Sequence, residues 1–317
     1  MQPPNPKQPL SDIRIVDLTH YVAGPNCTRM LAAFGADVVK VERPDGGDPA
    51  RRLGPFYKDD PHHEKSGLFM HLNGKKRSVT LNLKVTSGQL ILKAMVKEAD
   101  VLVESIRPGI MERLGLPEKA LRQVNRRLIM TSISNFGQTG PYLDYKASEL
   151  VLFGWGGPLH VTGLPEREPV KSGGRIVQYQ AGAVAALLTM LAIWNREERG
   201  CGEYIDLSFM ETQAGTMDRW VPILVNYAYT GQMAQRHTSM AATAGGIFPT
   251  RDGNVNTLNP SSPGRMDRIL NMIGRPAPCL GEHNEYAHME LLGYPHKRSR
   301  ELEEAGHIGR DYAPTIA

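Results

Sequence analysis

The chain has 317 residues, of which 41% are hydrophobic and 22% are charged, a composition typical of a globular protein that buries its own core. The formal net charge of +4 is too small to favour nucleic acid or a membrane as the main partner, and it is compatible with small anionic ligands at local basic sites. Cys27, Cys201 and Cys279 lie far apart and form no CxxC pair, so they predict neither a zinc site nor a disulfide framework and fit a cytoplasmic location. The first residues contain no apolar region of the kind found in secretory signals.

The first 140 residues alternate between strand-like and helix-like patterns. Short apolar runs rich in β-branched residues predict strands at 13–18, 36–41, 100–104 and 128–134. Helical patterns are found between them at 26–34, 88–99 and 117–125. Continuous apolar strands that alternate with helices indicate a parallel sheet covered on both faces, so we predict a doubly wound α/β domain.

The middle of the chain is predicted to be more helical. The apolar stretch 181–194 is shorter than the ~20 residues needed to span a bilayer. It ends at charged residues and Gly200, which is typical of a buried helix, here predicted at 180–196. The other predicted elements are a helix at 208–229, a hairpin at 250–256, and helical segments at 266–273 and 285–292.

Polar segments follow the predicted strands, where ligands bind in doubly wound sheets. The segment 20–25 opens a helix whose backbone amides can meet an anion, and Glu42 and Arg43 end the second strand, where a ribose-binding acid or a phosphate-binding arginine often lies. The basic turn 73–78 suits either phosphate groups or a solvated surface, and the loop 135–142 is either a site or a plain connection. A dinucleotide-binding domain is disfavoured because there is no GxGxxG motif, and the histidines form no metal-ligand pattern.

Several strings, taken together and in order, make the chain similar to the family III CoA-transferases, also called the CaiB/BaiF family. They are VDLTHYVAGPNCTRMLAAFGADVVKVERPDGGDPAR, LNGKKRSVTLNLK, ADVLVESIRPGIMERLGL, SISNFGQTGPY, GCGEYIDLSFME and CLGEHNEYAHMELLGYP. The first and the last are highly specific in combination, and the resemblance extends from about Leu10 to His307. It implies a doubly wound large domain, two chains that interlock, and activity on acyl-CoA thioesters, with transfer of CoA between carboxylic acids as the main reaction.

Carried over position by position, the resemblance implies that CoA binds along the strand ends, with Arg43 near its 3'-phosphate. The implied contacts are Val22, Ala23, Arg43, Leu81, Asn82, Leu83, Lys84, Ser105, Ile106, Arg107, Arg113, Lys146, Ala147, Ser148 and Glu149. The basic side chains in this set match the phosphate groups of CoA. No permanently bound cofactor and no metal is implied. The expected partners are acyl-CoA, a carboxylic acid acceptor and a second family chain in a homodimer or heteromer, with no nucleic acid and no membrane.

The catalytic positions depart from the family pattern. The transferases use an aspartate nucleophile four residues before the glycine that opens the long helix; here that glycine is Gly182, and the nucleophile position holds Gln178. An amide cannot attack a thioester to form the acyl-enzyme anhydride that this mechanism needs. The racemases of the family pair the same aspartate with a histidine, whose position here is Ser148. Glu149 and Glu166 are nearby carboxylates that are candidates to replace the aspartate.

The family's small domain is only partly recognisable in this chain. It normally follows a glycine-rich loop, here 244–246, and it is matched only to Arg275, before the C-terminal motif begins. We therefore predict a large CoA-binding domain at 1–230, a linker with a remnant of the small domain at 231–275, and a C-terminal segment at 276–317 that returns to the large domain. Three interpretations stay open: an active acyl-CoA enzyme, a non-catalytic CoA-binding subunit of a heteromeric CoA-transferase, and an inactive shortened paralogue.

Overall fold

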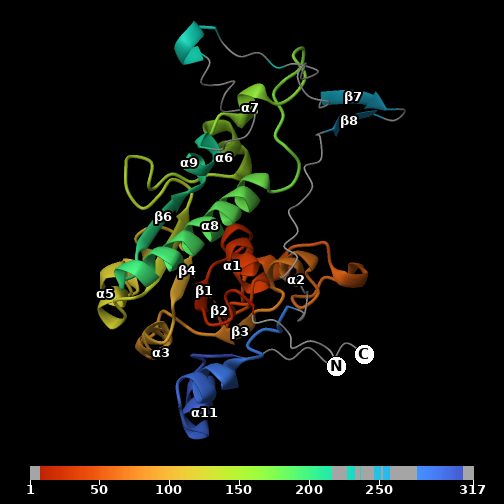
Figure 1. The fold of residues 1–317 in the computed structure, drawn as a ribbon. Coiled ribbons are helices and arrows are strands. Elements are labelled where there is room, and N and C mark those ends of the chain that lie inside the picture. Colours follow the sequence, from red (N-terminus) through yellow and green to blue (C-terminus); the bar gives the residue numbers. More distant parts are fainter. Residues whose placement is uncertain are drawn as a thin grey trace, which may run out of the picture.

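A computed structural model describes residues 8–215, 227–232, 236, 246–250, 253–257 and 277–309. Its central element is a six-stranded sheet with the strand order β3-β2-β1-β4-β5-β6 (Figure 1). The strands are β1 (Arg14–Leu18), β2 (Asp37–Glu42), β3 (Arg77–Thr80), β4 (Val101–Glu104), β5 (Ile129–Ser134) and β6 (Tyr204–Ser208). Every neighbouring pair is parallel, so the carboxyl ends of all six strands lie at one edge of the sheet.

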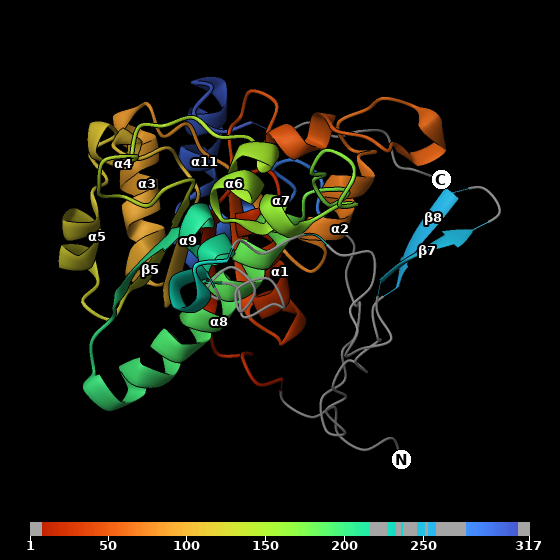
Figure 2. The same cartoon turned by 90° about the horizontal axis from the view of Figure 1, so that it is seen from above.

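Helices cover both faces of this sheet, and alternating strand residues supply the two cores. On one face, Ile15 packs with α1 (Ala23–Ala33) and α8 (Ile176–Arg199). On the other face, Val16 packs with α3 (Thr86–Lys97) and α5 (Glu118–Val124). Figure 2 shows these helix pairs on opposite sides of the strands. The predicted doubly wound α/β fold is therefore confirmed.

The remaining elements are shorter. They are α2 (Gly67–Asn73), α4 (Ile110–Arg113), α6 (Glu149–Trp155), α7 (Pro158–Val161), α9 (Phe209–Ala214), α11 (His296–Glu304), the 3-10 helices η1 (Pro49–Arg52) and η2 (Tyr57–Asp59), and a π-helix η3 (Tyr286–Leu291). The predicted hairpin is present as the antiparallel strands β7 (Gly246–Thr250) and β8 (Gly253–Thr257). The predicted helix at 266–273 lies outside the described residues.

Close packing between α1 and α8 fixes where α8 begins. A Cβ atom on Gly182 would lie 2.4 Å from the carbonyl oxygen of Ala23, so only glycine allows the two backbones to approach this closely. The side-chain amide of Asn26 donates to the Tyr179 carbonyl oxygen at 3.2 Å. These contacts hold the first turn of α8, including Gln178, beside the start of α1.

The long helix α8 was predicted at 180–196, but it has 24 residues. The additional first turn escaped prediction because it is not part of the apolar run. By length and composition, α8 is long and apolar enough to cross a bilayer, and it is the one such helix in the described part of the chain. Of its most apolar stretch of 18 residues, 39% is buried inside the protein. A core helix passes the same test, so this finding is weak evidence for a membrane span.

The C-terminal residues 277–309 lie against the edge strand β3. The backbone N–H of Thr80 donates to the Asn284 side-chain oxygen at 2.8 Å, and the N–H of Gly309 donates to the Thr80 hydroxyl at 2.7 Å. The N–H of Asn82 donates to the His307 carbonyl oxygen at 2.8 Å. A segment distant in sequence thus covers the end of β3.

Candidate functional site

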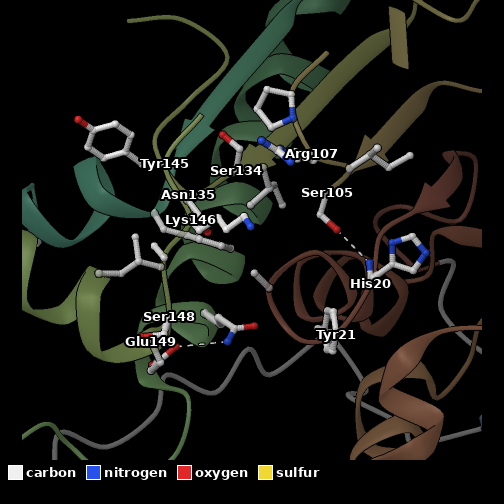
Figure 3. Close-up of a pocket in the computed structure, with 18 of the residues that line it drawn as sticks. His20, Tyr21, Ser105, Arg107, Ser134, Asn135, Tyr145, Lys146, Ser148 and Glu149 are labelled. Carbon is white, nitrogen blue, oxygen red and sulfur yellow. Dashed lines mark hydrogen bonds between the residues drawn. The ribbon is translucent and has the colours of Figure 1, made fainter. Parts of the chain in front are cut away.

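The carboxyl ends of β1, β4 and β5 open into a cavity of about 580 Å³ (Figure 3). The chain runs from β1 outward to β2 and β3 on one side, and from β4 to β5 and β6 on the other, so β1 and β4 flank the point where the strand order reverses. Ligands bind at such a switch point in open α/β sheets. The backbone N–H of His20, after β1, donates to the Ser105 hydroxyl, after β4, at 2.9 Å and joins the two sides of the crevice.

The turn after β1 forms one wall of the cavity. Tyr21 has a φ of 63°, in the left-handed region that non-glycine residues rarely adopt. Its N–H donates to the Asp48 carboxylate at 3.1 Å, and the Lys40 ammonium group donates to the Thr19 carbonyl oxygen at 2.9 Å. The buried pair of Lys40 and Asp48, 2.9 Å apart, therefore holds this turn in its strained conformation.

Two cationic side chains line the cavity on the side of β4 and β5. Arg107 follows β4, and its side chain is 58% exposed, with the still more exposed Asp144 as a partner at 3.7 Å. Lys146 precedes α6 and is exposed. Figure 3 shows Arg107 beside Ser134, Lys146 between Ser134 and Ser148, and Glu149 at the end of the cavity opposite Arg107. Exposed cations of this kind suit phosphate groups.

Glu149 and Gln178 meet at that opposite end. One carboxylate oxygen of Glu149 accepts the N–H of Val177 at 2.7 Å, and the other accepts the Gln178 side-chain amide at 3.3 Å. Glu149 thus lies at the N-terminus of α8, where the helix dipole stabilises a negative charge. Among the described residues, it is the one acidic side chain that lines the cavity.

Glu166, the second candidate carboxylate, does not line the cavity. It is exposed, in a segment held by Arg236, whose guanidinium donates to the carbonyl oxygens of Leu164 at 3.1 Å and Arg167 at 2.7 Å. Within the described structure, Glu149 is therefore the carboxylate that accompanies Gln178.

The predicted CoA contacts divide into two groups. Those that line the cavity are Ala23, Ser105, Ile106, Arg107, Lys146, Ala147, Ser148 and Glu149. Those that do not are Val22, Arg43, Leu81, Asn82, Leu83, Lys84 and Arg113. Val22 and Leu81 are buried. Arg43 is half-exposed and faces Asp45 at 3.7 Å.

Sequence reasoning missed several residues of the cavity lining, among them Arg175 and Tyr145. Arg175 precedes α8, and Tyr145 precedes Lys146 in the loop before α6. Tyr145 packs with Phe136, Tyr142 and Trp155 in a cluster with ring centroids 4.9 to 6.3 Å apart. The aromatic spacing was a possible signal for Tyr145. No signal in the sequence indicated Arg175, because α8 was expected to begin several residues later.

Charged residues that resembled surface or ligand contacts in the sequence are buried beneath the site. Lys76, from the basic turn, is fully buried and lies 3.1 Å from Asp17. Glu42, considered as a ribose-binding acid, instead accepts two hydrogen bonds from the buried Arg51 at 2.7 and 2.8 Å. Burial alone would raise the pKa of Asp17, but Lys76, Lys40 and two threonine hydroxyls hold that pKa well below its usual range.

Glu104, at the end of β4, gives a pH-dependent prediction. Burial, with smaller contributions from Glu112 and Asp206, raises the pKa of this carboxyl from 4.5 to about 7, although the Ile106 N–H donates to it at 2.6 Å. In the unfolded chain the carboxyl loses its proton at lower pH than in the fold. The free energy of unfolding should therefore fall as the pH rises from about 4.5 to about 7, by about 3 kcal/mol in total.

The variant Glu104→Gln keeps an acceptor for the Ile106 N–H but does not ionise. Relative to wild type, its free energy of unfolding is expected to rise by about 3 kcal/mol between pH 4.5 and pH 8. Urea unfolding of both proteins at the two pH values checks this. If the free energies of unfolding of the two proteins changed equally with pH, the raised pKa of Glu104 would be contradicted.

The described residues contain no group of three or more histidine, cysteine, aspartate or glutamate side chains placed to hold a metal ion. The cavity instead combines cationic side chains, hydroxyl and amide groups near the strand ends, and one carboxylate. This set can bind an anionic ligand and present a nucleophilic oxygen to it.

Comparison with known proteins identifies the family to which the chain belongs. The model of the family described as CoA-transferase family III matches residues 10–305. The beta subunit of succinyl-CoA–L-malate CoA-transferase from Chloroflexus aurantiacus is 33% identical over 97% of this chain and 73% of its own length. The alpha subunit of the same name from Chloroflexus aurantiacus is 31% identical over 92% of this chain, which spans 65% of that protein. A crystal structure of a CAIB/BAIF family protein from Brucella suis has a TM-score of 0.70 and 30% identity, with 78% of this chain and 65% of that chain covered. The chain therefore belongs to the CoA-transferase family III.

Proposed function

We propose that this chain binds the CoA portion of an acyl-CoA thioester in the strand-end cavity and transfers CoA between carboxylic acids. The observation that carries the proposal is the cavity itself, which lies at the switch point of the sheet and is lined by Arg107, Lys146 and Glu149. The two cations suit the phosphate groups of CoA, and a thioester directed to the other end of the cavity would reach the carboxylate.

In this proposal Glu149 is the nucleophile. A carboxylate oxygen attacks the thioester carbonyl carbon and the C–S bond breaks. CoA leaves as a thiolate, and the acyl group remains on Glu149 as a mixed anhydride. The thiolate then attacks the glutamyl carbonyl, releases the first acid and forms a glutamyl thioester. The carboxylate of the acceptor acid then attacks this glutamyl thioester and releases the CoA thiolate. The thiolate attacks the acceptor's carbonyl carbon, which forms the new acyl-CoA and restores the Glu149 carboxylate.

A second candidate function is that of a non-catalytic CoA-binding subunit. Both oxygens of Glu149 already accept hydrogen bonds from the start of α8, and position 178 carries an amide. The similar Chloroflexus proteins are named as the alpha and beta subunits of one enzyme. In this case a full-length family member would supply the nucleophile, whereas the first proposal is compatible with a homodimer. Either assembly would act in the cytoplasm.

Degenerate exchange tests the proposal without knowledge of the natural acceptor. The purified chain is incubated with an acyl-CoA and its own isotopically labelled free acid, and label entering the thioester is measured. Exchange by this chain alone is the expected result. CoA binding without exchange would contradict the transferase proposal and favour the subunit, and the absence of both would favour an inactive paralogue.

A further inference from the structure

Arg175 is a third cationic side chain in the lining of the cavity, in addition to Arg107 and Lys146. The residue lines the cavity directly before α8, and its Nη1 atom is buried without a hydrogen-bond partner. A buried polar donor without a partner is costly, and natural sites of this kind are usually completed by a ligand or water.

The position of Arg175 in the chain places it near the proposed reaction centre. It lies two residues before Val177 and three before Gln178, the two residues that hydrogen-bond to Glu149. Because Arg175 directly precedes these two residues, it belongs to the end of the cavity where Glu149 is found, and Figure 3 shows Arg107 at the opposite end. Glu149 and Arg175 form no ion pair, because the two carboxylate oxygens of Glu149 accept the Val177 N–H and the Gln178 side-chain amide instead.

We propose that Arg175 binds the distal carboxylate of a dicarboxylic acyl group, so that short dicarboxylic acids are the substrate class of this site. The inference rests on the proposed function, because it assumes that the thioester reaches the Glu149 end of the cavity. A guanidinium forms two parallel hydrogen bonds with a carboxylate, and the buried, unpaired Nη1 donor of Arg175 favours such a partner over a methyl group of similar size. The contact discriminates between acyl chains and leaves CoA binding itself unchanged.

Calorimetric titration with a matched pair of thioesters tests this. Succinyl-CoA and butyryl-CoA have acyl chains of equal length and differ in a terminal carboxylate or methyl group. Wild-type protein is expected to bind succinyl-CoA at least about tenfold more tightly than butyryl-CoA. In Arg175→Met this preference should disappear, with unchanged affinity for butyryl-CoA and free CoA. Arg175→Lys keeps the positive charge but cannot form the two parallel hydrogen bonds, so it should retain part of the preference for succinyl-CoA.

Two results would overturn the inference while the proposed function stands. One is an equal preference for succinyl-CoA in wild type and Arg175→Met. The other is a similar loss of affinity for free CoA and both thioesters in Arg175→Met, which would assign Arg175 to a phosphate of CoA. Failure of the folded wild-type protein to bind free CoA would instead overturn the proposed function, and the inference with it.

Discussion

Replacing Glu149 with glutamine is expected to slow degenerate exchange by about 10³-fold or more, while the affinity for CoA stays within about twofold. The reason is chemical, because an amide cannot form the acyl anhydride. Glutamine keeps an oxygen that accepts the Val177 N–H, so the start of α8 should stay in place. Exchange rates and CoA titrations of wild type and Glu149→Gln measure the two quantities separately.

A matched control distinguishes the nucleophile from its hydrogen-bond partner. Gln178→Asn also removes the 3.3 Å contact with Glu149 but leaves the carboxylate, so it should reduce exchange far less. Hydroxylamine added during turnover should convert an acyl or thioester adduct into a hydroxamate on Glu149, which peptide mass spectrometry detects. Undiminished exchange by Glu149→Gln would refute the assignment of this residue as nucleophile.

Replacing Asp17 with asparagine is expected to lower the free energy of unfolding by about 3–5 kcal/mol. Asp17 is fully buried and accepts hydrogen bonds from the hydroxyls of Thr19 at 2.5 Å and Thr28 at 2.6 Å, and from Lys76 at 3.1 Å. The variant would leave the Lys76 ammonium group buried without its countercharge. The pKa of Asp17 is lowered in the fold, so its contribution is present above about pH 4 and is lost as the pH falls.

Urea unfolding at neutral pH measures this loss, with Asp45→Asn as the control. Asp45 pairs with Arg43 at 3.7 Å, but its side chain is 78% exposed, so its replacement should change stability by less than about 1 kcal/mol. If Asp17→Asn lowered the free energy of unfolding no more than the control does, the buried pair of Asp17 and Lys76 would not stabilise the fold as their geometry implies.

The parallel sheet was predictable because its buried strands are continuous apolar runs separated by helical patterns. β6 was not predicted as a strand, because the other strands were recognised as continuous apolar runs, whereas Tyr204–Ser208 at the edge of the sheet alternates polar with apolar residues. The first turn of α8 was missed for a similar reason. Its buried contacts are made with α1 and α6, and nothing in the local sequence records these distant partners.

The candidate site was only partly predictable. The resemblance identified Arg107, Lys146 and Glu149, which line one cavity although they come from two separate segments of the chain. The basic turn was misleading, because the burial of Lys76 depends on Asp17, which is 59 residues away in the chain. Charge in a sequence does not reveal whether it faces solvent, and only the tertiary pairing decides this.

The most direct test of the account is calorimetric titration of free CoA into wild type, Arg107→Ala and Arg300→Ala. Arg107 lines the cavity, whereas Arg300 is an exposed arginine on α11 that carries the same charge outside it. Wild type and Arg300→Ala are expected to bind with a Kd near 1 μM, about −8 kcal/mol, and Arg107→Ala about tenfold more weakly. Folded protein that does not bind CoA, or equal affinity in all three proteins, would contradict the assignment of this cavity as the CoA site.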